Sequence, residues 1–288
     1  MNTAKDTLFE RFLAPAFNLL LDREALLHYR NSIDWEQARD RLERPNFSYP
    51  SYYQQQNFHG IKGGYLTPDA AVTYDPVTQY VLPPNETWVR QALVERVQVK
   101  PRRILDLGCG TGSTTLLLKQ AFPEAEVIGV DLSPYMLKVA EDKAQRQGLE
   151  IAFIHGQAET TGLPAASFDL VTASLLFHET PPQVSERILQ EALRLLTSGG
   201  EVLILDGSQA TLRQATWLMD IFEEPYIQDY AQHSVDAWLG AVGFGAVRTE
   251  TVWWVHQVSR GVKPITGRKP QWSVNVTEIT GATAGGVA

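Results

Sequence analysis

The chain has 288 residues, of which 44% are hydrophobic, and it carries a formal net charge of −8 with an isoelectric point near 5.3. This length and composition suffice for one large core with appendages, or at most for two domains. The acidic balance argues against a nucleic-acid-binding surface, because phosphate binding needs clustered Lys and Arg. The single cysteine, Cys109, excludes a disulfide framework and fits a reducing compartment.

Targeting and membrane segments are not indicated by the sequence. The first ten residues carry Lys5, Asp6 and Glu10 without a long apolar core, so they do not resemble a signal peptide. No run approaches the ~18 apolar residues that a membrane span requires. We therefore expect a cytoplasmic protein without a membrane span.

The N-terminal third is predicted to be helical with one long aromatic interruption. Apolar residues recur at helical spacing between residues 5 and 30, with a break at Pro15, and a short helix is predicted over Trp35–Arg44. Residues 46–64 are rich in aromatic residues, Gly and Pro, which predicts a loop rather than a regular element. Further helices are predicted over residues 68–80 and 85–97.

The stretch that follows predicts a nucleoside-binding turn. An apolar run over residues 104–107 indicates a buried strand, three glycines at alternate positions come next, and a helix is predicted over residues 114–122. Glycines at such a turn let the backbone approach a ligand closely, and the helix start offers free N–H groups. Asp131, nineteen residues after Gly112, ends a second apolar run. An acid in this place grips ribose hydroxyls in nucleotide-binding folds, so we predict an adenosyl-cofactor site.

The rest of the chain alternates between strand and helix, which predicts a doubly wound parallel sheet with right-handed crossovers. The predicted elements are a helix from 134 to 147, strands over 151–155 and 167–171, a helix from 182 to 196, a strand over 201–205, an insertion over 207–234, a short helix over 235–242 and a closing pair of strands within 245–258.

The spacing of the glycines separates two kinds of cofactor. A dinucleotide fingerprint would require glycine at position 113, where Ser113 stands, and Asp106 just before the glycines would repel a pyrophosphate. Here the sequence resembles the class I S-adenosylmethionine-dependent methyltransferases, whose first motif is matched by Leu-Asp-Leu-Gly-Cys-Gly-Thr-Gly at residues 105–112. The resemblance runs from about residue 102 to 258 and is closest to the ubiquinone/menaquinone-type and related small-molecule methyltransferases.

The resemblance implies a fold and a domain organisation. The fold would be α/β, with a Rossmann-like, doubly wound seven-stranded sheet in the order 3-2-1-4-5-7-6 and an antiparallel last strand. Residues 1–84 would form an N-terminal helical and aromatic lid that caps the substrate, and residues 85–260 the methyltransferase domain, with 207–234 as a substrate-side insertion. Residues 261–288 are expected to form a flexible tail.

The cofactor would be S-adenosyl-L-methionine, with S-adenosyl-L-homocysteine as product, bound at the carboxyl ends of the strands. Related enzymes often carry a Tyr-Asp pair before the first motif, where Tyr74-Asp75 stands here, and an adenine-binding Asp where Gln157 stands. Cys109 is interpreted as a small residue that fits rather than as a nucleophile. The predicted cofactor-binding residues are Tyr74, Asp106, Gly108, Cys109, Gly110, Gly112, Thr114, Asp131, Leu132, Met136, Gln157, Ala158, Glu159 and Ser174.

The predicted catalytic residues follow the fourth strand. Methyl transfer from a sulfonium is an in-line displacement, so the protein mainly aligns the acceptor and keeps water away. An oxygen or nitrogen acceptor also needs a base, for which His178 is the first candidate; the alternative is a histidine that only holds its loop. Glu179 either orients His178 or caps the next helix, and His59 is a weaker candidate. A metal site is not expected, because His178 and Glu179 lack a partner at ligand spacing.

The acceptor is expected to be a small, partly apolar metabolite that is methylated on O, C or N, because aromatic residues gather in segments 47–65 and 217–230. Two alternatives stay open: a nicotinamide-dependent oxidoreductase, and a non-catalytic module that binds S-adenosylmethionine or S-adenosylhomocysteine. Neither the acceptor nor the oligomeric state follows from the sequence. The predicted substrate-binding residues are Tyr53, Tyr65, Phe177, Trp217, Phe222, Tyr226 and Trp254.

Overall fold

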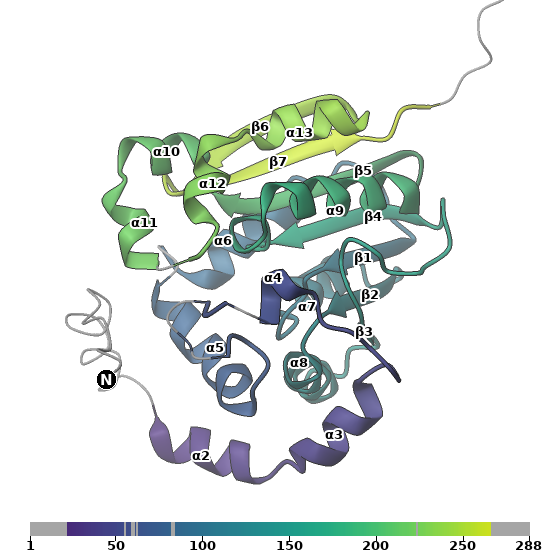
Figure 1. Ribbon diagram of the computed structural model, residues 1–288. Coiled ribbons are helices and arrows are strands. Elements are labelled where there is room, and N and C mark those ends of the chain that lie inside the picture. The colour runs from purple at the N-terminus through teal and green to yellow at the C-terminus, as the bar shows by residue number, and fades with distance from the viewer. Residues whose placement is uncertain are drawn as a thin grey trace, which may run out of the picture.

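A seven-stranded sheet runs through the centre of the computed structural model, with the strand order β3-β2-β1-β4-β5-β7-β6 (Figure 1). The structure describes residues 22–265 except 55, 59, 60, 62, 82, 83 and 223, so the expectations for residues 1–21 and for the tail beyond 265 lie outside it. The strands are β1 (Arg103–Leu107), β2 (Glu126–Asp131), β3 (Ala152–His155), β4 (Phe168–Ser174), β5 (Leu196–Gly207), β6 (Gly245–Val252) and β7 (His256–Val262).

The predicted topology is confirmed. The first five strands pair in parallel, and β7 lies antiparallel between β5 and β6. The parallel strands all end at the same edge of the sheet, so the turns after β1, β2 and β4 and the end of β5 meet there. This edge is where a doubly wound sheet binds its ligands.

Helices cover both faces of the sheet because the strands bury apolar side chains in alternation. Leu105 and Ile204 belong to the core on the side of α9 (Pro182–Leu195) and α13 (Val235–Val242). Their strand neighbours Ile104 and Leu203 belong to the core under other helices. The remaining helices are α2 (Arg23–Asn31), α3 (Trp35–Leu42), α4 (Ser51–Gln54), α5 (Pro68–Val81), α6 (Glu86–Val94), α7 (Ser113–Ala121), α8 (Pro134–Arg146), α10 (Gln209–Gln214), α11 (Trp217–Phe222) and α12 (Ile227–Gln232), together with the short 3₁₀ helix η2 (Phe177–Glu179).

The element boundaries differ from the prediction in a few places. The loop predicted over 46–64 contains the one-turn helix α4. The strand predicted over 167–171 continues to Ser174 although Thr172 and Ser174 are polar, because Thr172 and Ala173 pair with both neighbouring strands and Ser174 pairs with β5. The strand predicted to begin at residue 201 begins at Leu196, so it includes the residues that the sequence assigned to a turn.

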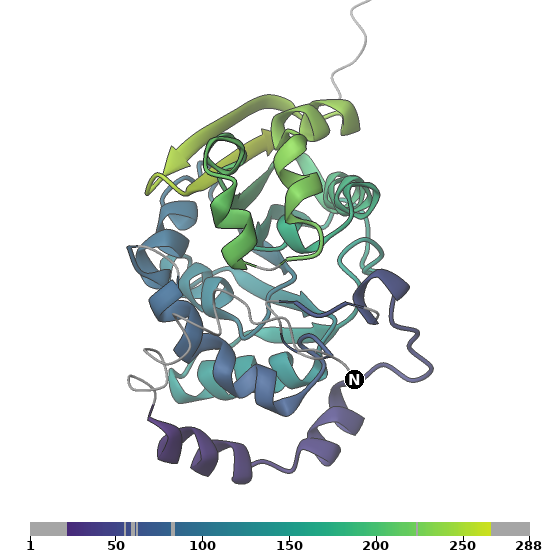
Figure 2. The same cartoon turned by 60° about the vertical axis from the view of Figure 1, so that its left-hand side comes forward.

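The N-terminal helices lie along one side of the domain, where α2 and α3 follow α5 and α8 (Figures 1 and 2). An ion pair between Arg41 of α3 and Glu141 of α8 joins the two layers. The helices of the insertion, α10 to α12, stand at the other end of the sheet, near η2 (Figure 2). Among the helices of the described residues, none combines the length and the apolar character that a bilayer crossing would require.

Candidate active site

The turn between β1 and α7 depends on glycine. Gly108, Gly110 and Gly112 have φ values of 63°, 54° and 78°, a region that other residues enter only with strain. At Gly108 a Cβ atom would also lie 2.8 Å from Cδ1 of Leu176, which follows β4. The turn therefore keeps its backbone exposed to a ligand and packs directly against the end of the fourth strand.

Asp131 ties the glycine turn to the end of β2. Its Oδ2 accepts a hydrogen bond from the backbone N–H of Gly110 and its Oδ1 accepts one from Ser133, each at 2.8 Å. The pKa of Asp131 is raised to about 6, chiefly because the carboxyl group is buried. The two backbone hydrogen bonds lower this pKa, whereas the charges of the nearby Glu179 and Asp106 raise it. Near pH 7.5 the carboxylate is ionised and retains acceptor capacity for hydroxyl groups.

A cavity opens at this edge of the sheet, enclosed by the glycine turn, the ends of β2 and β4 and residues of the segments that precede β1. Tyr52, Tyr53, Tyr65 and Tyr74 contribute four phenol rings to its wall, and Leu175 and Leu176 an apolar side. The predicted residues on its wall are Tyr53, Tyr65, Tyr74, Gly108, Cys109, Gly110, Asp131, Leu132, Met136, Ala158, Glu159, Ser174 and Glu179.

Four predicted cofactor residues lie behind or beside the wall. Asp106 is buried, and its carboxylate accepts hydrogen bonds from Thr115 Oγ1 at 2.6 Å and Thr172 Oγ1 at 2.7 Å. Thr114 accepts a hydrogen bond from Arg90. The amide of Gln157 donates to the carbonyl oxygen of Ser48 at 3.2 Å. The fourth, Gly112, caps the start of α7.

Cys109 is on the wall but is not poised for nucleophilic chemistry. Burial raises the pKa of its thiol well above the ordinary value, and the charges of Asp131 and Asp106 add to that effect. Its Sγ atom would lie 2.8 Å from a Cβ at Gly129, so the thiol fills the space beside β2. This placement agrees with the interpretation of Cys109 as a small residue that fits.

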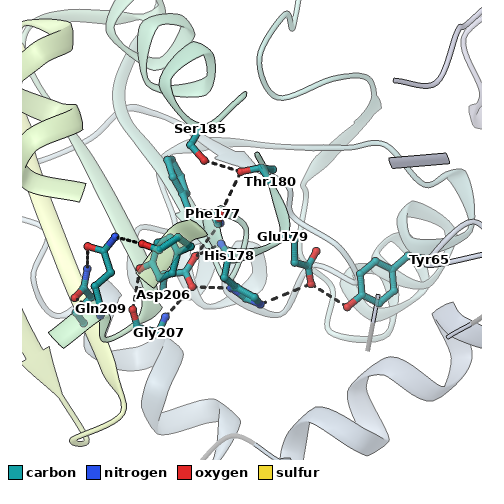
Figure 3. A network of polar contacts seen from close by, with 11 residues as sticks. Tyr65, Phe177, His178, Glu179, Thr180, Ser185, Asp206, Gly207 and Gln209 are labelled. Atoms are coloured by element: carbon teal, nitrogen blue, oxygen red, sulfur yellow. Dashed lines mark hydrogen bonds and ion pairs between the residues drawn. The ribbon is translucent and has the colours of Figure 1, made fainter. Parts of the chain in front are cut away.

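The predicted catalytic residues form a polar network with the end of β5 (Figure 3). His178 Nδ1 lies 2.6 Å from Asp206 Oδ1, and its Nε2 lies 3.9 Å from Glu179 Oε1. Tyr65 donates a hydrogen bond to the same Glu179 oxygen at 2.9 Å. Glu179 and Tyr65 reach the cavity wall, whereas His178 stands one layer behind them. His59 lies outside the described residues.

Burial lowers the pKa of His178, but the charge and hydrogen bond of Asp206, with the charges of Glu179 and Glu224, outweigh it and raise the pKa to about 9. His178 is therefore an imidazolium at neutral pH. In that form both ring nitrogens are donors, and neither accepts a proton.

The predicted substrate residues are dispersed. Phe177 is fully buried and packs near Trp238, away from the wall. Trp217 and Trp254 are 56% and 65% exposed. Tyr226 donates a hydrogen bond to the backbone oxygen of Tyr52 and so joins the insertion to the lid. The side chain of Phe222 lies outside the described part of the chain.

Two charged residues at the site, Arg90 and Asp206, were not among the residues predicted from the sequence. Arg90 is the one basic side chain among the described residues of the wall; its guanidinium bonds Glu86 at 2.8 Å and Thr114 at 2.9 Å. The sequence feature that could have pointed to Arg90 is its spacing from Glu86, because an acid and a base four residues apart on a helix can form an ion pair. Asp206 was the other omission, although an acid at the end of a parallel strand stands where ligands bind.

Polar atoms on the wall fit an adenosyl sulfonium cofactor. Ser174 Oγ and Glu159 Oε2 are buried and have no hydrogen-bond partner among the described residues. Buried polar atoms normally have partners, so these two oxygens indicate that a ligand completes them. Together with Asp131 they supply acceptors for hydroxyl and amino groups, and the carboxylates match a cationic ligand.

Comparison with known proteins also identifies methyltransferases as relatives of this chain. The model of a methyltransferase domain matches residues 104–200. The demethylmenaquinone methyltransferase of Thermus thermophilus is 39% identical over 119 residues, 41% of this chain and 53% of that protein. That of Bacillus cytotoxicus is 31% identical over 161 residues, 52% of this chain and 67% of that protein. A SAM-dependent methyltransferase structure from Aquifex aeolicus has a TM-score of 0.52 at 19% identity, covering 68% of this chain and 98% of that one.

The sheet order and the glycine turn define a Rossmann-like methyltransferase domain. The chain belongs to the class I S-adenosylmethionine-dependent methyltransferases, and S-adenosylmethionine is its cofactor. The chain spans about half the length of the first curated relatives that it matches. Family membership argues against the nicotinamide-dependent oxidoreductase that the sequence had left open.

Proposed function

We propose that the protein transfers a methyl group to an O, C or N atom of a small, partly apolar acceptor bound in the cavity at the carboxyl edge of the sheet. One observation carries this proposal: a single cavity joins the glycine turn and Asp131 to a wall of phenol rings, leucines and Glu179. The first part suits a nucleoside, and the second suits a ring-shaped or apolar acceptor with an ionisable group.

The residues divide into two tasks. Asp131 would accept hydrogen bonds from the ribose hydroxyls, the backbone of Gly108 and Gly110 would lie along the cofactor, and Arg90 would attract its carboxylate. When bound, the cofactor supplies a methyl group that is already activated on a sulfonium. Leu175 and Leu176 would exclude water from the reacting carbon, and the phenol rings would orient the acceptor by packing on it.

The acceptor to test first is a demethylmenaquinone-like hydroquinone with a short isoprenoid tail. The relatives from Thermus thermophilus and Bacillus cytotoxicus carry that activity in their names. An aromatic hydroquinone would also suit the phenol rings of Tyr52, Tyr53 and Tyr65, since aromatic pairs pack favourably.

The test is incubation with methyl-labelled S-adenosylmethionine, once with this hydroquinone and once with a metabolite extract. We expect labelled product from the hydroquinone or from an extract component, together with S-adenosylhomocysteine. Unaltered S-adenosylmethionine in both reactions, despite demonstrated binding, would contradict the proposal. It would favour instead a module that binds the cofactor without catalysis.

A further inference from the structure

The buried Asp206 fixes the 3₁₀ turn that follows β4. Its Oδ2 accepts backbone hydrogen bonds from Phe177 at 2.8 Å and from His178 at 3.4 Å, and its Oδ1 accepts one from Gly207 at 2.7 Å. The same Oδ1 binds the imidazole of His178 at 2.6 Å. Four contacts on one fully buried carboxylate leave the ring of His178 a single orientation.

This orientation directs the far side of the ring toward Glu179 (Figure 3), and His178 is not among the residues that line the cavity. Glu179 is held from its other side by the phenol of Tyr65 and lies on the cavity wall beside Ser174 and Thr180. The order of the network from the sheet outward is therefore Asp206, His178, Glu179 and the cavity.

The charges that face these two groups come from several elements. Around His178 they are Asp206 of β5, Glu179 of η2, Glu224 before α12 and His256 of β7, with the ring of Tyr230 of α12 beside it. Around Glu179 they are Asp131 of β2 and the phenols Tyr53, Tyr65 and Tyr74. Burial lowers the pKa of His256 to about 4, so it is neutral and adds no positive charge.

We infer that Glu179, not His178, is the side chain that takes the proton from the methyl acceptor, and that the Asp206–His178 pair is a positioning device behind it. This inference rests on the proposed function and differs from the expectation from the sequence, in which His178 was the first candidate base and Glu179 either oriented it or capped the next helix. The imidazolium beside Glu179 supports a negative charge there, and Glu179 is the member of the pair that an acceptor can touch.

The reaction balances as follows. The acceptor atom uses an electron pair to form its bond to the methyl carbon as the carbon–sulfur bond breaks, and that bond's electron pair stays on the sulfur of S-adenosylhomocysteine. The proton of the acceptor passes to a carboxylate oxygen of Glu179 and later to solvent. His178 keeps its proton throughout, so the protonation states of His178 and Asp206 do not change during the reaction.

A nuclear magnetic resonance titration of the imidazole nitrogens of His178 tests this order of roles without turnover. In the wild-type protein we expect His178 to be protonated at pH 7 and to titrate near pH 9, and in Asp206→Asn to titrate at least one pH unit lower. A neutral His178 at pH 7 in the wild-type protein would overturn the inference. This result does not depend on the acceptor, so it distinguishes failure of the inference from failure of the proposed function.

Turnover of the short-tailed hydroquinone, or of the acceptor identified from the extract, gives the second readout. We expect Glu179→Gln to lower kcat about a hundredfold with little change in the KM for S-adenosylmethionine, and Glu179→Asp to restore part of it. Glu250→Gln on β6 serves as the matched control, with unchanged kcat. Activity of Glu179→Gln within threefold of the wild type would remove Glu179 from the reaction.

Discussion

Asp106 and Asp131 show how far residue identity alone predicts a site. Both acids follow apolar runs of neighbouring strands, and both were predicted to contact the cofactor. Asp106 lies opposite Thr172 in the register between β1 and β4 and is bonded by Thr172 and Thr115, so it is a buried structural carboxylate. Only Asp131, at the last position of its strand, reaches the wall. The sequence shows where the acids stand, but it does not show which of them is hydrogen-bonded by other residues of the protein rather than left available to a ligand.

Replacement of Asp131 measures its contribution to cofactor binding. We expect Asp131→Ala to weaken S-adenosylhomocysteine binding at least tenfold, because hydrogen bonds to a charged acceptor are each worth about 1.5–3 kcal/mol. Isothermal titration calorimetry gives the affinity. Glu126→Gln is the matched control, since Glu126 begins the same strand, pairs with Arg103 at the surface and lies far along β2 from the cavity. Equal affinity of Asp131→Ala and wild type would remove Asp131 from the site.

The same carboxylate gives cofactor binding a pH dependence. Because the pKa of Asp131 in the folded protein is about 6, it is ionised at pH 7.5 and mostly protonated at pH 5. The carboxylate accepts hydroxyl groups best when ionised, so S-adenosylhomocysteine affinity should fall up to about tenfold between these pH values. Asp131→Asn should lose this dependence. A flat profile in the wild-type protein would contradict the assignment.

At the scale of elements, the sequence predicts best where strand and helix alternate with clear punctuation. The strands, the long helices and the glycine turn all follow from apolar runs and caps, such as Ser133 at the start of α8. The insertion is less predictable, because α10, α11 and α12 have six residues each and are placed by contacts between segments, such as those of α10 with α12 and of α12 with η2. The placement of Asp206 beside His178 likewise depends on contact between distant segments, which no local pattern reports.

The turn between β1 and α7 can be tested with two glycines of similar backbone conformation. Gly108 and Gly148 have φ values of 63° and 65°, but only at Gly108 would a Cβ collide, with Leu176, whereas at Gly148 it would meet nothing within 4 Å. We expect each alanine variant to lose about 1–2 kcal/mol of unfolding free energy from backbone strain. Only Gly108→Ala should also weaken S-adenosylhomocysteine binding, by more than tenfold, because it displaces Leu176 into the cavity. Similar calorimetric affinities for the two variants would show that the turn tolerates a side chain.

At the scale of the whole molecule, the cavity is assembled from N-terminal segments and the edge of the sheet together. Asp75 of α5 pairs with Lys143 of α8 at 2.7 Å and accepts a hydrogen bond from Thr111 in the glycine turn at 2.5 Å. Helix α5 is thereby fastened to α8 and to the glycine turn. The family resemblance predicted a lid in this region, but the contacts that fasten it depend on the folded arrangement of three separate segments.

The free energy of unfolding should depend on pH because of the Asp206–His178 pair. His178 has a pKa near 9 when folded and about 6.5 when unfolded, so its stabilisation is complete below pH 6.5 and is lost as the pH rises through 9. We expect the unfolding free energy to fall by about 1–2.5 kcal/mol more in the wild type than in Asp206→Asn between pH 7 and 9.5. Urea denaturation at both pH values measures this difference. Parallel pH profiles of the two proteins would exclude a charged His178.

We propose that the cavity between the glycine turn and Glu179 holds the cofactor with its reactive carbon facing the end of β4. A crystal structure of the protein with saturating S-adenosylhomocysteine tests this claim most directly. We predict ribose hydroxyls within hydrogen-bonding distance of Asp131 and the sulfur atom directed toward Ser174 and Glu179. Density for the ligand at any other place, with this cavity empty, would contradict the account.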